Sequence, residues 1–169
     1  ADETTKVEFI KAALQRMAPR QVVDLGCNTG KYSLLSAEFA DHVVAMDFDP
    51  ACINTLYRRC KAAGMTKITP VIADMLNPSP SLGWRLRERR AIVQRASGDT
   101  FLALALVHHI CISGNVPIAQ FIEHLAEFGP QGGIVEWVGK DDAMVQRMLR
   151  NRVDVFADYA WPHFSEALA

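Results

Sequence analysis

The amino-acid sequence predicts an α/β fold, a doubly wound and mainly parallel sheet with helices on both faces. Two observations lead to this prediction. Short apolar runs rich in β-branched residues alternate five times with longer stretches whose apolar residues have helical spacing. The short runs are apolar at consecutive positions, which is typical of parallel strands that are buried on both faces.

The first expected elements are a helix, a strand and a second helix. Apolar residues recur at helical spacing over 4–17, and Pro19 ends that helix. The valine-rich run 21–25 predicts a buried strand that ends at Gly26. The next helix is expected over 32–40.

The second strand–helix unit has clear boundary signals. The run 42–46 predicts a strand. Asp49 followed by Pro50 is typical of a helix N-terminus, with the aspartate as N-cap and the proline at the first helical position. Gly64 is placed to end that helix, and 68–73 predicts the third strand.

The C-terminal half continues the same alternation. A charged stretch over 84–95 is expected to be helical, and the apolar run 101–107 predicts the fourth strand. A helix over 117–128 has its apolar residues on one face, and 133–138 predicts the fifth strand. Residues 140–152 are expected to form a helix, with an irregular or helical tail.

Composition and charge exclude several classes of protein. A chain that is 50% hydrophobic and 22% charged is neither disordered nor a coiled coil. Its 18 basic and 19 acidic residues leave a net charge of −1, so no global field attracts nucleic acid or an anionic membrane. No apolar run approaches the roughly 20 residues that span a bilayer. A nucleic-acid partner is therefore not favoured, and we expect no membrane partner.

The four cysteines indicate a reducing compartment. Cys27, Cys52, Cys60 and Cys111 are scattered and form no C-x-x-C motif, which argues against a zinc site and against a disulfide framework. We expect no metal, reduced thiols and a cytoplasmic protein. No activating base stands near Cys27 in sequence, so a nucleophilic role for it is not indicated.

A glycine-bearing loop follows the first expected strand, where open α/β sheets bind ligands. It reads Asp24-Leu-Gly26-Cys-Asn-Thr-Gly30. A dinucleotide fingerprint starting at Gly26 would need glycines where Asn28 and Lys31 stand. A P-loop would need four residues between its glycines, and only three separate Gly26 from Gly30. The spacing therefore disfavours a phosphate-binding loop.

The loop resembles motif I of class I S-adenosylmethionine-dependent methyltransferases, D/E-x-G-x-G-x-G, with Asn28 in place of the middle glycine. The resemblance implies a Rossmann-like methyltransferase fold that binds S-adenosylmethionine. The glycines would let the backbone approach the cofactor, and Asp24 would act on its ammonium group directly or through water. A tight strand-to-helix turn without a ligand is the structural alternative. The cofactor-binding residues expected in and after this loop are Asp24, Gly26, Cys27, Asn28, Gly30 and Tyr32.

The next two strand ends extend the resemblance. Asp47 at the end of the second strand corresponds to the acid that binds the ribose hydroxyls, and Phe48 is placed to stack on adenine. Asp74 and Met75 after the third strand match the family's contacts with the adenine amino group and ring. Each residue alone is a weak signal. Three successive strand ends with the expected residues predict a shared cofactor site.

Two adjacent histidines, His108 and His109, follow the fourth strand. Small-molecule methyltransferases often carry a similar stretch, so the resemblance makes either histidine a candidate base that takes the proton released on methylation. Both could instead orient the loops, because methyl transfer often needs no base.

The stretch 84–95 and the chain's end carry a narrower resemblance. The stretch 84–95 contains five arginines and one glutamate. It is either a patch that binds an anionic substrate or RNA, or a solvated helix with packed arginine stems. Similarity to bacterial methyltransferase-like proteins labelled nodulation-related covers 78–109, 142–150 and 156–159. The methyltransferase fold ends with a β-hairpin, for which too few residues remain after Phe164. We expect a single S-adenosylmethionine-binding domain over 1–169, without that hairpin and cut from a longer chain.

The expected function is S-adenosylmethionine-dependent methylation of an unidentified acceptor, with a small molecule favoured. No N-P-P-Y-like stretch follows the fourth strand, which disfavours amino groups of bases or of glutamine as acceptors. One alternative is a non-catalytic S-adenosylmethionine-binding module of a larger protein that contains further domains. The other is a nicotinamide-dependent oxidoreductase, which the glycine spacing disfavours.

Overall fold

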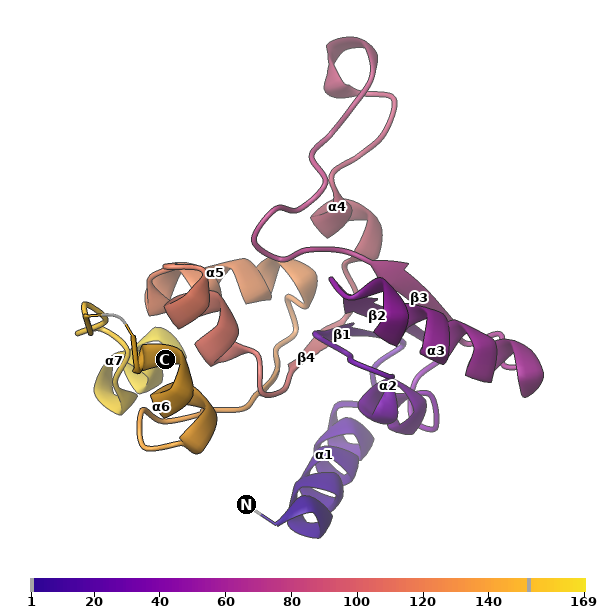
Figure 1. The fold of residues 1–169 in the computed structure, drawn as a ribbon. Coiled ribbons are helices and arrows are strands. Elements are labelled where there is room, and N and C mark those ends of the chain that lie inside the picture. The colour runs from indigo at the N-terminus through magenta and orange to yellow at the C-terminus, as the bar shows by residue number, and fades with distance from the viewer. Residues whose placement is uncertain (1, 152) are drawn as a thin grey trace.

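A five-stranded parallel sheet in the order β3-β2-β1-β4-β5 forms the centre of the protein in this computed structural model, which describes residues 2–151 and 153–169 (Figure 1). The strands are β1 (Gln21–Leu25), β2 (His42–Asp47), β3 (Ile68–Ile72), β4 (Thr100–Ala103) and β5 (Gly133–Val135). All four pairings are parallel, which confirms the predicted doubly wound sheet. The strand order reverses between β1 and β4, and ligands bind at such a switch point in open α/β sheets.

Helices cover both faces of the sheet, as the sequence predicts. On one face lie α1 (Glu3–Met17), α2 (Lys31–Ser36) and α3 (Pro50–Ala62), and a cluster of buried side chains joins them to the sheet. The other face is covered by α4 (Ile92–Ala96), α5 (Ile118–Phe128), α6 (Ala143–Leu149) and α7 (Trp161–Ala167). None of the described helices is long and apolar enough to cross a membrane.

Strand β1 shows why the short runs are apolar at consecutive positions. Val22 points to the cluster beneath α1–α3, whereas Val23 and Leu25 point to the cluster beneath α4–α7. All three are fully buried, because β1 pairs with β2 on one side and with β4 on the other. A central parallel strand has no solvent face, so both sets of alternate positions are apolar.

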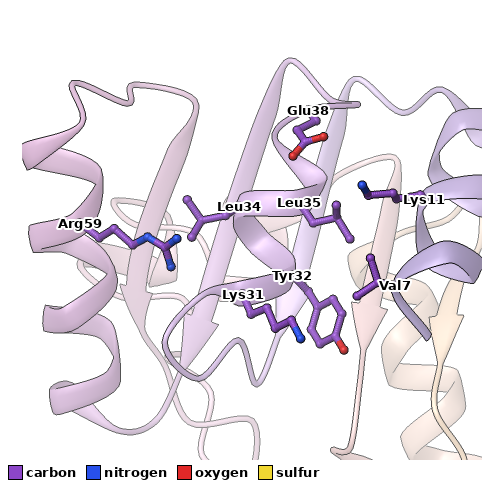
Figure 2. A pocket seen from close by; sticks show the side chains of 8 residues that line it. All are labelled: Val7, Lys11, Lys31, Tyr32, Leu34, Leu35, Glu38 and Arg59. Atoms are coloured by element: carbon purple, nitrogen blue, oxygen red, sulfur yellow. The ribbon is translucent and has the colours of Figure 1, made fainter. Parts of the chain in front are cut away.

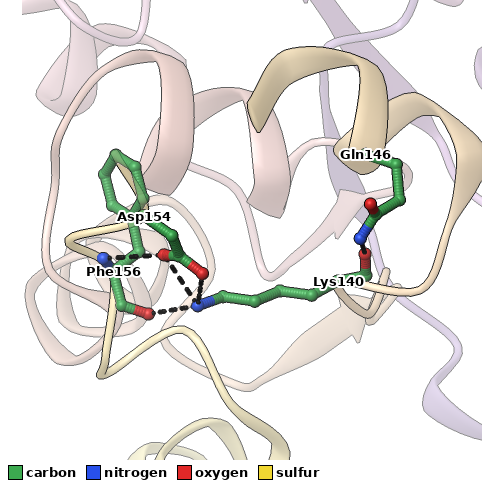
Figure 3. A network of polar contacts seen from close by, with 4 residues as sticks. All are labelled: Lys140, Gln146, Asp154 and Phe156. Atoms are coloured by element: carbon green, nitrogen blue, oxygen red, sulfur yellow. Dashed lines mark hydrogen bonds and ion pairs between the residues drawn. The ribbon is translucent and has the colours of Figure 1, made fainter. Parts of the chain in front are cut away.

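A polar network fastens the C-terminal segment to the residues after β5 (Figure 3). Lys140 Nζ donates to Asp154 Oδ2 at 2.8 Å and to the Phe156 carbonyl at 2.7 Å. This arrangement precedes Tyr159, whose hydroxyl donates to the Val138 carbonyl at 2.6 Å and whose ring stacks on Trp137 with centroids 4.8 Å apart. The segment before α7 is thereby held against the chain that continues β5.

The charged stretch after β3 is not the single helix that was expected over 84–95. It forms an arm that projects from the rest of the molecule (Figure 1) and is closed by an antiparallel bridge between Leu82 and Arg89. Only a 3₁₀ turn, η1 (Trp84–Leu86), and the short α4 are helical here. Arg85 and Leu86 have positive φ, and the arginine-rich sequence offers no apolar stripe that would pack a helix.

Other element boundaries also differ from the prediction. Strand β4 ends at Ala103 instead of residue 107, because Ala105 has a φ of 50° and the chain then turns into the π-helical turn η2 (His109–Ser113). Strand β5 is likewise shorter than 133–138. Helices α2 and α6 are shorter than 32–40 and 140–152, and residue 152 lies outside the described residues. Within 2–151 and 153–169, no strand follows β5.

Candidate functional site

The loop after β1 is fastened to the end of β2. The amides of Gly26 and Cys27 both donate to the Met46 carbonyl, at 2.8 and 2.9 Å. The Gly30 amide donates to the Cys27 carbonyl at 2.8 Å, which closes the turn into α2. The predicted cofactor loop therefore lies beside Asp47, at the carboxyl edge of the sheet.

Asp47 organises this edge through its carboxylate. Its Oδ2 accepts from the Asn28 amide at 2.8 Å and its Oδ1 from the Asp49 amide at 2.9 Å. The residue is 8% exposed. Since an ionised carboxylate has about four lone-pair sites, two remain for further donors such as ribose hydroxyls.

Asn28 occupies the place of the middle glycine in motif I because the backbone there is left-handed. Its φ is 51°, a region that asparagine tolerates better than most residues. Its side-chain Oδ1 accepts from the Thr29 amide at 2.7 Å and so stabilises the turn. The departure from the family pattern therefore keeps the shape of the loop.

Gly26 and Gly30 have positive φ, but protein side chains lie where their Cβ atoms would be. A Cβ on Gly30 would approach Leu56 Cδ1 of α3 to 2.3 Å, and one on Gly26 would approach Leu106 Cδ1 to 3.1 Å. The sequence predicted close approach of a ligand at both positions. In the structure, the space that a side chain would need at each glycine is taken by a leucine from a neighbouring part of the fold.

Asp24 lies in the interior beneath α2. It is 2% exposed, and Ser33 Oγ donates to its Oδ2 at 2.5 Å. Burial raises the pKa of this carboxyl from 3.8 to about 6; the charge of Asp47 adds to the rise and the Ser33 bond opposes it. For the predicted contact, the ammonium group of the cofactor would therefore have to reach a carboxyl group that is enclosed in the interior.

This burial predicts a pH-dependent effect of Asp24→Asn on stability. Between about pH 4 and pH 6 the native state binds more protons at this carboxyl than the unfolded state, so its stability falls as the pH rises through this window. Above pH 6 the burial of the charged form costs up to about 3 kcal/mol. We expect the variant to be more stable than wild type at pH 8 in urea denaturation, with a smaller difference at pH 4. If the variant and wild type differed in stability by the same amount at both pH values, the raised pKa of Asp24 would be contradicted.

Phe48, Asp74 and Met75 gather beyond the ends of β2 and β3. The Ala73 amide donates to the Asp47 carbonyl at 2.9 Å, which places the chain after β3 beside the end of β2. Phe48 is 74% exposed, as an aromatic surface available for stacking must be. Asp74 is exposed and accepts from the Leu76 amide at 2.8 Å, and Met75 packs against the core at its edge.

The two histidines after β4 have different environments. His108 is 4% exposed, His109 is exposed, and their ring centroids are 4.2 Å apart. Burial, followed by the neighbouring His109, lowers the pKa of His108. Among the described residues, His108 Nδ1 has no hydrogen-bond partner, and a buried nitrogen in that state needs an explanation.

The structure adds a half-buried ion pair that sequence reasoning missed. Lys6 Nζ of α1 lies 2.6 Å from Glu136 Oε2, directly after β5, and 5.0 Å from the centroid of the Tyr32 ring. Glu3 accepts from the Tyr32 hydroxyl at 3.1 Å and also pairs with Lys31. Because 130 residues separate Lys6 from Glu136, no local pattern could have indicated the pair.

The cysteines show no arrangement for nucleophilic or metal chemistry. All four are free, and burial raises the pKa of the Cys27 thiol, with contributions from Asp24 and Asp47. The described part of the chain contains no group of three histidine, cysteine or acidic side chains that could hold a metal ion. Cys27 therefore contributes to the loop as a buried side chain.

A surface hollow lies on the outer side of α2, between α1 and α3 (Figure 2). Val7 and Lys11 extend from α1 on one side and Arg59 from α3 on the other. Of the predicted site residues only Tyr32 lines it. Neither Asp47 nor Asp74 takes part in the lining, so this hollow does not define the candidate cofactor site.

Comparisons with known proteins agree with this geometry. Residues 22–83 match a family model described as a methyltransferase domain. The chain is 38% identical over 165 residues to the nodulation protein NoeA of Rhizobium meliloti (strain 1021), which covers 97% of this chain and 34% of NoeA. This similarity confirms the predicted resemblance to nodulation-related proteins. The chain spans about a third of the length of that curated relative.

Solved methyltransferase structures share the fold. The bifunctional kinase-methyltransferase WbdD matches with a TM-score of 0.65 and 16% identity over 96% of this chain and 34% of that one. Magnesium protoporphyrin IX methyltransferase (ChlM) from Synechocystis PCC 6803, solved with bound SAM, matches with a TM-score of 0.53 and 18% identity over 74% of this chain and 53% of that one. The family match over 22–83, the similarity to NoeA over most of the chain and the shared fold support the predicted resemblance to class I S-adenosylmethionine-dependent methyltransferases.

Proposed function

We propose that the protein binds S-adenosylmethionine and transfers its methyl group to a small-molecule acceptor. The observation that carries the proposal is the convergence of three strand ends on Asp47. Its carboxylate holds the loop after β1, and its carbonyl holds the chain after β3. The ends of β1, β2 and β3 thus lie side by side at one edge of the sheet, which supports the proposed ribose and adenine contacts.

The described residues suit this cofactor in type and place. Asp47 would accept from the ribose hydroxyls, and Phe48 with Asp74 and Met75 would hold the adenine. The loop 24–30 and Tyr32 would hold the methionine end. When bound, S-adenosylmethionine supplies a methyl group already activated by its sulfonium, so the protein contributes mainly proximity and alignment.

The acceptor class, the compartment and the domain organisation belong to the same proposal. A small acceptor fits the histidine pair beside the switch point, and the net charge of −1 gives nucleic acid no general attraction. The four free thiols support a cytoplasmic location. We further propose that residues 1–169 act as one cofactor-binding domain within a longer protein, as the partial coverage of NoeA suggests.

One of the two histidines is the proposed base. His109 is exposed and therefore accessible to an acceptor, whereas His108 is enclosed behind it. We expect His109→Ala to lower the rate constant of methyl transfer by about a hundredfold, the lower range for loss of a general base, with unchanged affinity for S-adenosylhomocysteine. Single-turnover kinetics with the acceptor would measure this. Wild-type rates in the variant would exclude His109 as the base.

Calorimetric titration tests the cofactor assignment first. S-adenosylhomocysteine is the ligand and NAD is the control. Micromolar binding of the first without the second supports the proposal, and binding of neither by a folded sample contradicts it. A methyl-transfer assay on the full-length protein then separates an enzyme from a non-catalytic S-adenosylmethionine-binding module.

A further inference from the structure

The ion pair between Lys6 and Glu136 lies at the carboxyl edge of the sheet, where Glu136 directly follows β5. The Glu136 amide donates to the Ala103 carbonyl at 3.0 Å, and Ala103 is the register partner of Leu25 in β1. Glu136 is therefore level with the start of the motif I loop. Lys6 reaches it from α1 and lies over Tyr32, the second residue of α2. The pair thus joins the chain after β5 to the helix after β1.

Charges of both signs surround Tyr32 at this place. Lys6 and Lys31 lie 5.0 and 5.5 Å from its ring centroid. Burial and the hydrogen bond to Glu3 raise the pKa of Tyr32 to about 12, and the charges of Glu3, Glu136 and Asp24 add to the rise. Glu136 and the enclosed Asp24 therefore both act on the Tyr32 hydroxyl, so the ring marks a region where ammonium and carboxylate groups already meet.

The position of Lys6 shows which chemical group this region accepts. Its ammonium contacts a carboxylate and an aromatic face, the two partners that recognise alkylammonium groups. The Lys6 side chain is 19% exposed and that of Glu136 is 31% exposed, so neither charge is freely solvated. A ligand that supplied both an ammonium and a carboxylate could replace each partner without leaving a buried charge alone.

Building on the proposed function, we propose that Lys6 and Glu136 form a clamp for the zwitterionic amino-acid end of the cofactor. When the ligand binds, the ion pair opens. Lys6 then binds the carboxylate of the ligand, and Glu136 binds its ammonium group. Helix α1 thereby becomes part of the cofactor site. The clamp makes affinity depend on the amino-acid moiety of the ligand, separately from its adenosine.

Three ligands separate the clamp from the adenosine pocket. S-adenosylhomocysteine carries both charges, decarboxylated S-adenosylmethionine lacks the carboxylate, and 5′-methylthioadenosine lacks the whole amino-acid moiety. Each is titrated calorimetrically into wild type, the single variant Lys6→Met and the double variant Lys6→Met/Glu136→Gln. The double variant removes both charges together, so neither remains buried without its partner.

We expect the double variant to bind S-adenosylhomocysteine about ten- to a hundredfold more weakly, as for loss of charged hydrogen bonds. Its affinity for 5′-methylthioadenosine should stay unchanged. Lys6→Met alone should weaken S-adenosylhomocysteine but not decarboxylated S-adenosylmethionine, because only the first presents a carboxylate to Lys6.

The Lys140–Asp154 pair offers a matched control. Its side chains are 31% and 45% exposed, its charged atoms are 2.8 Å apart, and it belongs to the network before α7. Lys140→Met/Asp154→Asn should leave the affinities for all three ligands unchanged. Melting curves of every variant confirm that the titrated protein is folded.

The outcomes distinguish the clamp from the proposed function. Equal weakening of S-adenosylhomocysteine and 5′-methylthioadenosine, or a lower melting temperature with unchanged affinities, would show that the pair only anchors α1, and the clamp proposal would be wrong. The adenosine pocket would still stand in either case. If folded wild type binds none of the three ligands, the proposed function and the clamp both fall.

Discussion

Replacement of Asp47 by alanine is expected to weaken the binding of S-adenosylhomocysteine by about 1–3 kcal/mol, or roughly five- to 150-fold. The variant loses the charged acceptor proposed for the ribose. It also leaves the amides of Asn28 and Asp49 without their present acceptor, so the loop after β1 loses one of its hydrogen bonds to the end of β2 and keeps those to the Met46 carbonyl. Calorimetry on the variant and wild type gives the difference directly.

The neighbouring Asp49 is the matched control for this experiment. Its Oδ1 accepts from the Ala51 amide at 2.8 Å as the N-cap of α3. Asp49 is not among the proposed cofactor-binding residues. Asp49→Ala should lower stability by about 1 kcal/mol through loss of the cap and leave the affinity unchanged. Wild-type affinity of the Asp47→Ala variant would refute the ribose assignment.

The order of the elements and the parallel sheet could be predicted, because both follow from local patterns. Valine-rich runs such as 42–46 are apolar at consecutive positions only where both faces are covered, and Asp49-Pro50 marks a helix start in the chain itself. The end of β4 could not be predicted. Leu104 and Val107 are buried, yet the left-handed backbone at Ala105 turns them into the loop that leads to η2.

The positions of the candidate site residues were predictable only where a residue lies at the end of a strand or just after it. Asp47 and Asp74 are of that kind, since their places follow from the strands before them. The hydrogen bond from the Ser33 hydroxyl to the Asp24 carboxyl depends on how α2 packs against β1. The Lys6–Glu136 pair depends on how closely α1 approaches the chain after β5. Such contacts arise from tertiary packing, which leaves no periodic signal in the sequence.

Replacement of Gly30 by alanine is expected to give the largest loss of stability. The variant also tests whether this glycine is needed for the packing of the fold or for the ligand. A Cβ at this position would lie 2.3 Å from Leu56 Cδ1 and 2.7 Å from Leu56 Cδ2. Leu56 is fully buried, so it has little room to move away. The φ of +82° adds backbone strain, and we expect a total loss of about 2–4 kcal/mol in urea denaturation.

Gly64 distinguishes the clash from the strain. It has a φ of +62°, and no atom lies within 4 Å of a Cβ built on it. Gly64→Ala should therefore cost only about 1 kcal/mol, the strain alone. A similar loss in both variants would show that Leu56 yields to the new methyl group. If instead Gly30→Ala is much the less stable, the last glycine of motif I is required first for the packing of α2 against α3, and the shape of the cofactor loop follows from that packing.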